Sequence, residues 1–122
     1  MNPKFIPMIY NYLDRNGNKY TISKKSIEYM PIKPSFSSSG VYDGGDYIKK
    51  DISEIQYNNL TYILNAAVKN KKIHIKNRVK MSSLIVFQKK NKEKAYILSP
   101  DSEQISKIEN LLKKLISTEL SL

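Results

Sequence analysis

Apolar and polar residues alternate over much of the first thirty positions, which is the pattern of half-buried β-strands. Two such runs, residues 9–13 and 19–22, flank the sequence DRNGN at residues 14–18, which places a glycine where a turn needs positive φ. We therefore expect a β-hairpin here. A third strand over residues 26–30 should end at Pro31, because proline has no N–H to donate to a sheet.

Two later stretches repeat apolar residues at helical spacing. Ser53 and Gln56 match a capping box, in which each side chain accepts a hydrogen bond from the other residue's backbone N–H, and they predict a helix over residues 54–69. Near the C-terminus, Ser99 stands in an N-cap position before a second helix over residues 100–118. In that helix we expect Glu109 and Lys113 to pair on the outer surface.

Two short apolar runs between these helices, residues 84–87 and 95–98, indicate strands joined by the charged segment 89–94. The order of elements predicts the α+β class, as a single domain over residues 1–122. We expect an antiparallel sheet of about five strands with two amphipathic helices packed on one face. A long Ser/Gly-rich loop over residues 33–50 lies within this domain.

The composition agrees with one folded domain, because 40% of the 122 residues are hydrophobic and 26% are charged. The absence of cysteine excludes disulfides and zinc–thiolate sites, and a single histidine leaves few metal ligands, so we expect neither a metal nor a cofactor. No run of 18 apolar residues or signal-peptide core is present. These features predict a cytoplasmic protein without membrane contact, although the mature part of an exported protein would look the same.

The formal charge of +10 is concentrated in one part of the chain. Residues 69–94 contain ten of the 21 cationic side chains and one of the 11 acidic ones. Lysine accounts for 19 of the 21 cations, and the bias toward Lys, Asn and Ile is typical of an AT-rich genome. Codon bias explains part of the basicity, but not its concentration in 26 residues.

Within this region, cationic or histidine side chains alternate with mostly apolar ones over residues 72–80. On a strand, this alternation puts the basic side chains on one face and turns Val79 and Met81 to the core. The alternative is a strand that simply exposes lysines to water. The predicted anion-binding residues are Lys72, His74, Lys76, Arg78 and Lys80 on this strand and Lys89, Lys90, Lys92 and Lys94 in the following hairpin.

This surface predicts a small non-enzymatic binding module. Nucleic acid is the first candidate partner and an acidic protein surface the second. The enzymatic alternative is a metal-independent ribonuclease in which His74, Arg78 and Lys80 supply the base and the cations. A lone histidine cannot supply base and acid together, so the binding module is the preferred hypothesis.

The stretch from Ser35 to Tyr47 contains three of the four glycines and is longer than most connections in a compact domain. Its spaced tyrosines distinguish it from a flexible spacer. We therefore expect an ordered recognition loop, as in an inhibitor or immunity-type protein or a homodimer contact, with packing over the sheet end as the structural alternative. The loop residues concerned are Ser37, Ser38, Ser39, Gly40, Tyr42, Asp43, Gly44, Gly45, Asp46 and Tyr47.

Overall fold

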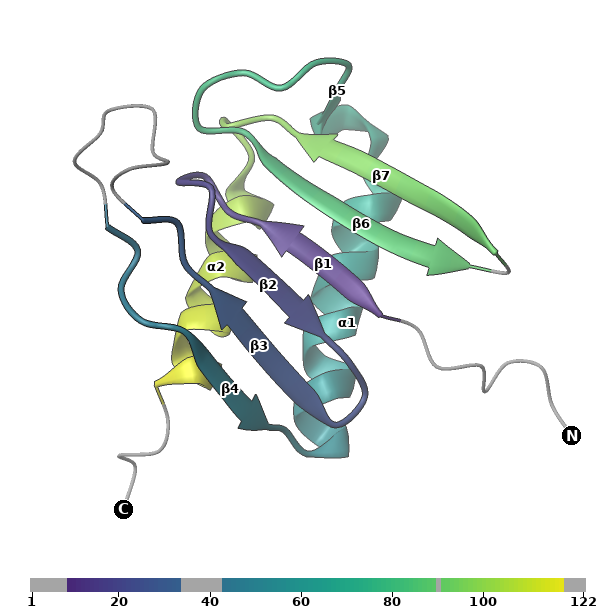
Figure 1. The fold of residues 1–122 in the computed structure, drawn as a ribbon. Coiled ribbons are helices and arrows are strands. Elements are labelled where there is room, and N and C mark those ends of the chain that lie inside the picture. The colour runs from purple at the N-terminus through teal and green to yellow at the C-terminus, as the bar shows by residue number, and fades with distance from the viewer. Residues whose placement is uncertain (1–8, 34–42, 90, 118–122) are drawn as a thin grey trace, which may run out of the picture.

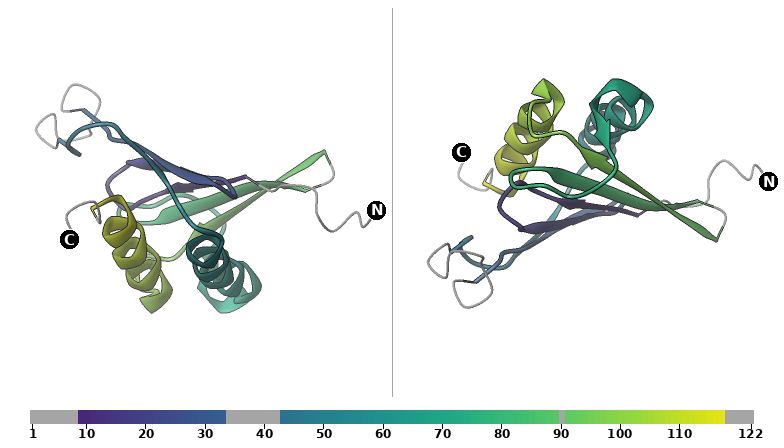
Figure 2. Two further views of the ribbon diagram at one scale, coloured as in Figure 1. Left: turned by 90° about the horizontal axis from the view of Figure 1, so that it is seen from below. Right: turned by 90° about the horizontal axis from the view of Figure 1, so that it is seen from above.

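The computed structural model describes residues 9–33, 43–89 and 91–117, and over these the chain is α+β. Two helices lie on one face of a single antiparallel sheet (Figures 1 and 2). The predicted class is confirmed, but the sheet has seven strands rather than about five. The strands are β1 (Tyr10–Leu13), β2 (Lys19–Ile22), β3 (Ser26–Met30), β4 (Ile48–Asp51), β5 (His74–Ile75), β6 (Ser83–Lys89) and β7 (Lys92–Leu98). The helices are α1 (Glu54–Lys69), a 3-10 turn η3 (Lys71–Ile73) and α2 (Glu103–Ile116).

The strands follow the order β4-β3-β2-β1-β6-β7-β5 across the sheet, and every pair is antiparallel. The predicted hairpin of β1 and β2 is present, with Gly17 at a φ of 94° in its turn. The Asp14 carboxylate fixes that turn by accepting hydrogen bonds from the backbone N–H groups of Asn16 and Asn18, both at 2.9 Å. This side chain is buried, so the turn is held from inside the protein.

The long predicted loop is partly a strand, because β4 occupies its last residues and pairs with β3. The sequence of β4, IKKD, has only one apolar residue and gave no strand signal. Its position explains this composition: β4 is the edge of the sheet, where charged side chains remain in solvent.

The predicted basic strand over residues 72–80 is wrong. Only His74 and Ile75 pair with β7, after the 3-10 turn η3, and the chain then forms an irregular loop up to β6. Val79 is 51% exposed and Met81 43% exposed, so neither side chain enters the core. The sequence alternates as a strand does, but the backbone bends at Lys76 and Asn77, directly after β5, and so leaves the extended conformation that the alternation requires. Met81 adopts a φ of 69° further along the loop.

The second predicted hairpin is present with longer strands than the sequence indicated. Lys89 and Lys92 face each other at the ends of β6 and β7, and Asn91 adopts a φ of 67° in the turn. The lysines expected in a loop therefore belong mostly to strands. Alternation on β7 places Lys92 and Lys94 on the face toward the helices and Glu93 on the opposite face.

Helix α1 begins and ends at the predicted residues, and its capping box is present. Gln56 N–H donates to the Ser53 hydroxyl at 3.1 Å, and Ser53 N–H donates to the Gln56 side chain at 2.8 Å. Helix α2 begins later than predicted, because Ser102 rather than Ser99 is its N-cap.

The core fills the space between the sheet and the two helices. Among its completely buried side chains are Tyr12, Tyr20, Ile22, Ile27, Leu60, Leu64, Ile85, Leu98, Ile105, Ile108 and Leu112. Over the described ranges, neither helix has the length and apolar character that a membrane span requires.

Candidate anion-binding hollow

A hollow of about 370 Å³ opens between α1 and the strands β1, β6 and β7. Tyr10, Phe87 and Lys94 are paired neighbours on these three strands, so their side chains lie in one row on the helix side of the sheet. The lining residues are Tyr10, Asn65, Val68, Lys69, Phe87, Lys94 and Tyr96. The volume is at the lower end of the range for ligand pockets, which suits one small group rather than a large ligand.

Aromatic rings form the floor and one wall of the hollow. The ring centroids of Tyr10 and Phe87 are 5.4 Å apart in an edge-on arrangement, and those of Phe87 and Tyr96 are 6.0 Å apart. Tyr10 and Phe87 are almost entirely buried, whereas Tyr96 is half-buried and offers more of its ring.

The polar groups of the hollow favour an anion. Lys69 of α1 and Lys94 of β7 both line the hollow, and both lysines are exposed. The Tyr10 hydroxyl donates to the Asn65 side-chain oxygen at 2.9 Å, which leaves the Asn65 amide N–H groups available as donors. Burial raises the pKa of Tyr10, so its hydroxyl stays neutral at physiological pH.

The structure brings together only part of the predicted basic surface. Lys94 lines the hollow, but its partner there is Lys69, which the sequence analysis did not select. The other described lysines of the surface, Lys72, Lys76, Lys80 and Lys92, are exposed outside the hollow. Lys69 lies in the last turn of α1. Lysine is common at this position in helices, so the sequence did not indicate a binding role for it.

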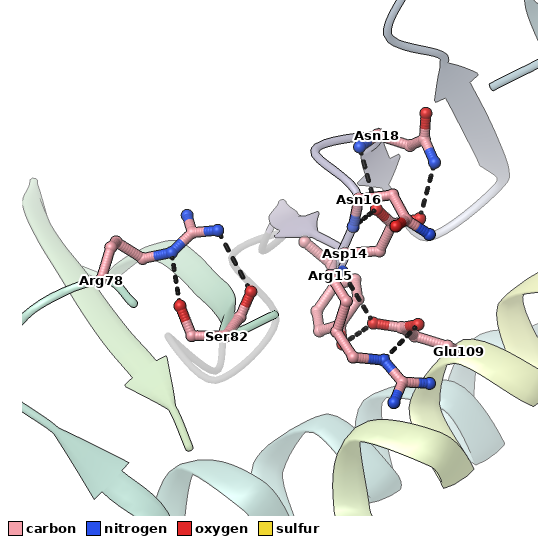
Figure 3. Close-up of polar contacts among 8 residues, drawn as sticks. Asp14, Arg15, Asn16, Asn18, Arg78, Ser82 and Glu109 are labelled. Carbon is pink, nitrogen blue, oxygen red and sulfur yellow. Dashed lines mark hydrogen bonds and ion pairs between the residues drawn. The ribbon is translucent and has the colours of Figure 1, made fainter. Parts of the chain in front are cut away.

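His74 and Arg78 both have structural partners. The His74 ring hydrogen-bonds the Ala67 carbonyl through Nε2 at 2.9 Å and packs on Tyr96, so it supports the wall of the hollow. The Arg78 guanidinium donates to the hydroxyl and carbonyl of Ser82 at 2.9 and 3.1 Å (Figure 3). Neither side chain forms a hydrogen bond or ion pair with the other or with the exposed Lys80.

The predicted recognition loop lies partly outside the described residues, which include it only from Asp43 onward. Gly44 packs against the β1–β2 turn, and a Cβ added to it would lie 2.1 Å from the Asn18 side-chain oxygen. Tyr47 is 53% exposed, and its hydroxyl donates to Glu28. Asp46 is exposed, and Gly45 adopts a φ of 99°. At this end of the loop, Gly44 therefore packs on the hairpin turn and Tyr47 contacts β3.

A buried carboxylate that the sequence analysis placed on the surface holds the hairpin to α2 (Figure 3). Glu109 is 3% exposed and accepts hydrogen bonds from the Tyr12 hydroxyl at 2.8 Å and from the Arg15 backbone N–H at 3.1 Å. The Arg15 guanidinium lies 3.3 Å from the same carboxylate. Burial, followed by the charge of Glu109, raises the pKa of Tyr12.

The fold and the hollow define a two-layer α+β protein with a cationic, aromatic-lined site. No known family model matches the sequence, and no curated protein matches it. Over the described ranges, no three histidine, aspartate or glutamate residues are grouped so that they could hold a metal ion.

Proposed function

We propose that the protein is a non-enzymatic module that binds single-stranded nucleic acid. The observation that carries this proposal is that Lys69, Lys94 and Tyr96 line one hollow. Single-strand binding sites combine cations that contact the phosphates with aromatic rings on which bases stack. The exposed lysines of residues 69–94 extend the cationic surface beyond the hollow.

Because most cations of the protein are lysines, we expect little preference for any nucleotide sequence. Bases are read mainly by bidentate arginine, whereas a lysine ammonium contacts phosphates as a point charge. One of the two arginines, Arg78, is held by Ser82, and the other, Arg15, is paired with Glu109. Neither guanidinium is therefore available to read bases without breaking contacts of the fold.

The test is fluorescence anisotropy of a labelled mixed-sequence DNA strand at low salt. We expect Lys69→Glu and Lys94→Glu each to weaken binding by about tenfold or more, since each removes a phosphate contact and adds repulsion. Lys107→Glu on α2 is the matched control, because Lys107 is exposed outside the hollow, and it should have a much smaller effect.

Absence of binding at low salt by the wild-type protein would contradict the proposal. An equal loss in all three variants would show attraction by net charge without a site. Binding of an acidic protein but of no DNA or RNA strand would replace nucleic acid by the second candidate partner.

A further inference from the structure

No helix of the described residues lies on the second face of the sheet, as both views in Figure 2 show. Strand register identifies the side chains that point to this open face. Leu13, Leu84, Ile97 and Ile75 are consecutive partners on β1, β6, β7 and β5, so they form one apolar row across four strands. Asn11, Val86 and Ala95 form the next row. None of these seven side chains is charged.

The charge of the open face differs from that of the whole chain. Its charged strand residues are Lys19 and Lys49 together with Glu28, Asp51 and Glu93, which give a formal charge of −1. The chain as a whole carries +10. Nucleic acid and acidic proteins are therefore less attracted to this face than to the basic surface. Because the charge of the face is small and its central rows are uncharged, two copies can place it against each other with little repulsion between the two faces.

The open face has an exposed apolar side chain, Ile9, next to a hollow. Ile9 is 50% exposed at the start of β1. A hollow of about 290 Å³ lies next to it, lined by Ile9, Asn11, Val86, Phe87, Gln88 and Glu93. In a two-fold arrangement, the same patch of each subunit contacts the other, so Ile9 of each copy can fill the hollow of its partner.

We propose that the open face binds the same face of a second copy, which gives a two-fold dimer with two packed sheets. Seven strands at about 4.8 Å spacing and about four residues in length give a footprint on the order of 500 Å². Stable interfaces bury about 800 Å² on each partner. The dimer is therefore weak and forms at high protein concentration. The anion-binding hollows lie on the helix sides and remain open in it.

Sedimentation velocity over about a hundredfold range of protein concentration tests the proposal, because a weak dimer dissociates on dilution. We expect the wild type to change from monomer to dimer as concentration rises. Ile9→Lys and Val86→Lys should remain monomeric, since each places a charge in the interface. Tyr62→Lys is the matched control: Tyr62 is 76% exposed on α1, and this variant should dimerise as the wild type does.

Far-UV circular dichroism establishes that each variant is folded, and Val86→Thr replaces Val86→Lys if the lysine disrupts β6. A wild type that stays monomeric at the highest concentration overturns the proposal and leaves the face to a different protein. A dimer that is as strong in Ile9→Lys as in the wild type, or that Tyr62→Lys abolishes, also overturns it. The dimer requires no nucleic acid, so this test is independent of the proposed function.

Discussion

Glu109 is the side chain whose position differs most from its expected one. It was expected on the surface because a charged residue four positions before a lysine on a helix normally forms an exposed pair. In the structure it lies beside the apolar face of α2 and accepts three hydrogen bonds from β1 and the hairpin turn. Those partners are 94 and 97 residues away in the sequence, so helical spacing alone cannot indicate the contact.

Removal of this carboxylate should destabilise the protein strongly. In Glu109→Ala the buried Tyr12 hydroxyl loses its acceptor, so we expect the free energy of unfolding to fall by about 2–3 kcal/mol. Urea unfolding followed by circular dichroism measures it. Asn110→Ala, at the exposed neighbouring position, should change the value by less than about 0.5 kcal/mol. Equal effects of the two substitutions would show that the carboxylate does not hold the hairpin.

Stability should also fall at alkaline pH because of Tyr12. Its pKa in the folded protein is raised above 10.0 by burial and by the charge of Glu109. Below pH 10 both states hold the proton and the contribution is complete. Above that value the unfolded chain ionises first, and stability falls by up to about 1.4 kcal/mol for each pH unit. The loss above pH 10 should be less steep in Tyr12→Phe, as measured by urea midpoints, and equal slopes would contradict this assignment.

Gly44 provides a third prediction for a single position. The sequence analysis included Gly44 among the residues of a recognition loop. The structure instead places Gly44 so close to the Asn18 side chain that a Cβ would displace it from the Ile32 N–H. We expect Gly44→Ala to lower the free energy of unfolding by about 1–3 kcal/mol. Asp46→Ala, two residues later and exposed, should have little effect on the thermal midpoint, and a similar loss from both would refute the steric explanation.

At the scale of elements, the sequence predicted those helices and turns that are stabilised by contacts between residues close together in the chain. The start of α1 follows from its capping box. The first hairpin follows from its turn, in which Asp14 and Gly17 lie within five consecutive residues. The basic segment at residues 72–80 has the alternation of a strand, yet Ser82 forms hydrogen bonds with this segment in place of strand pairing. The Ser82 hydroxyl accepts from the Val79 N–H at 3.1 Å and from the Arg78 guanidinium at 2.9 Å. The hollow was missed because it joins residues of α1 to three strands.

Ser82 should therefore keep the loop between β5 and β6 closed to proteases. Loss of its hydroxyl in Ser82→Ala removes two of the contacts that order this loop, so local opening becomes more frequent. We expect trypsin to cleave after Arg78 and Lys80 several-fold faster than in the wild type, as measured by mass spectrometry over time. Ser106→Ala on the exposed side of α2 is the control. Unchanged cleavage in Ser82→Ala would show that other contacts order the loop.

At the scale of the whole molecule, the two faces of the sheet differ in chemistry. The helix side contains the hollow with Lys69 and Lys94, whereas the open face is largely uncharged at its centre. The +10 charge predicted an anionic partner from the sequence, but not which surface would meet it. The arrangement separates the proposed nucleic-acid site from the proposed surface for a second copy, so both can be occupied at once.

The most direct measurement for the proposed function is an NMR titration of the wild-type protein with a short single-stranded oligonucleotide. The binding site predicts the largest changes in amide chemical shift at Asn65, Lys69, Lys94 and Tyr96, with saturation as the oligonucleotide is added and reversal by salt. Amides of the open face, such as those of Leu84 and Val86, should change little. Shifts centred on the open face, or no saturable change around the hollow at low salt, would contradict the account.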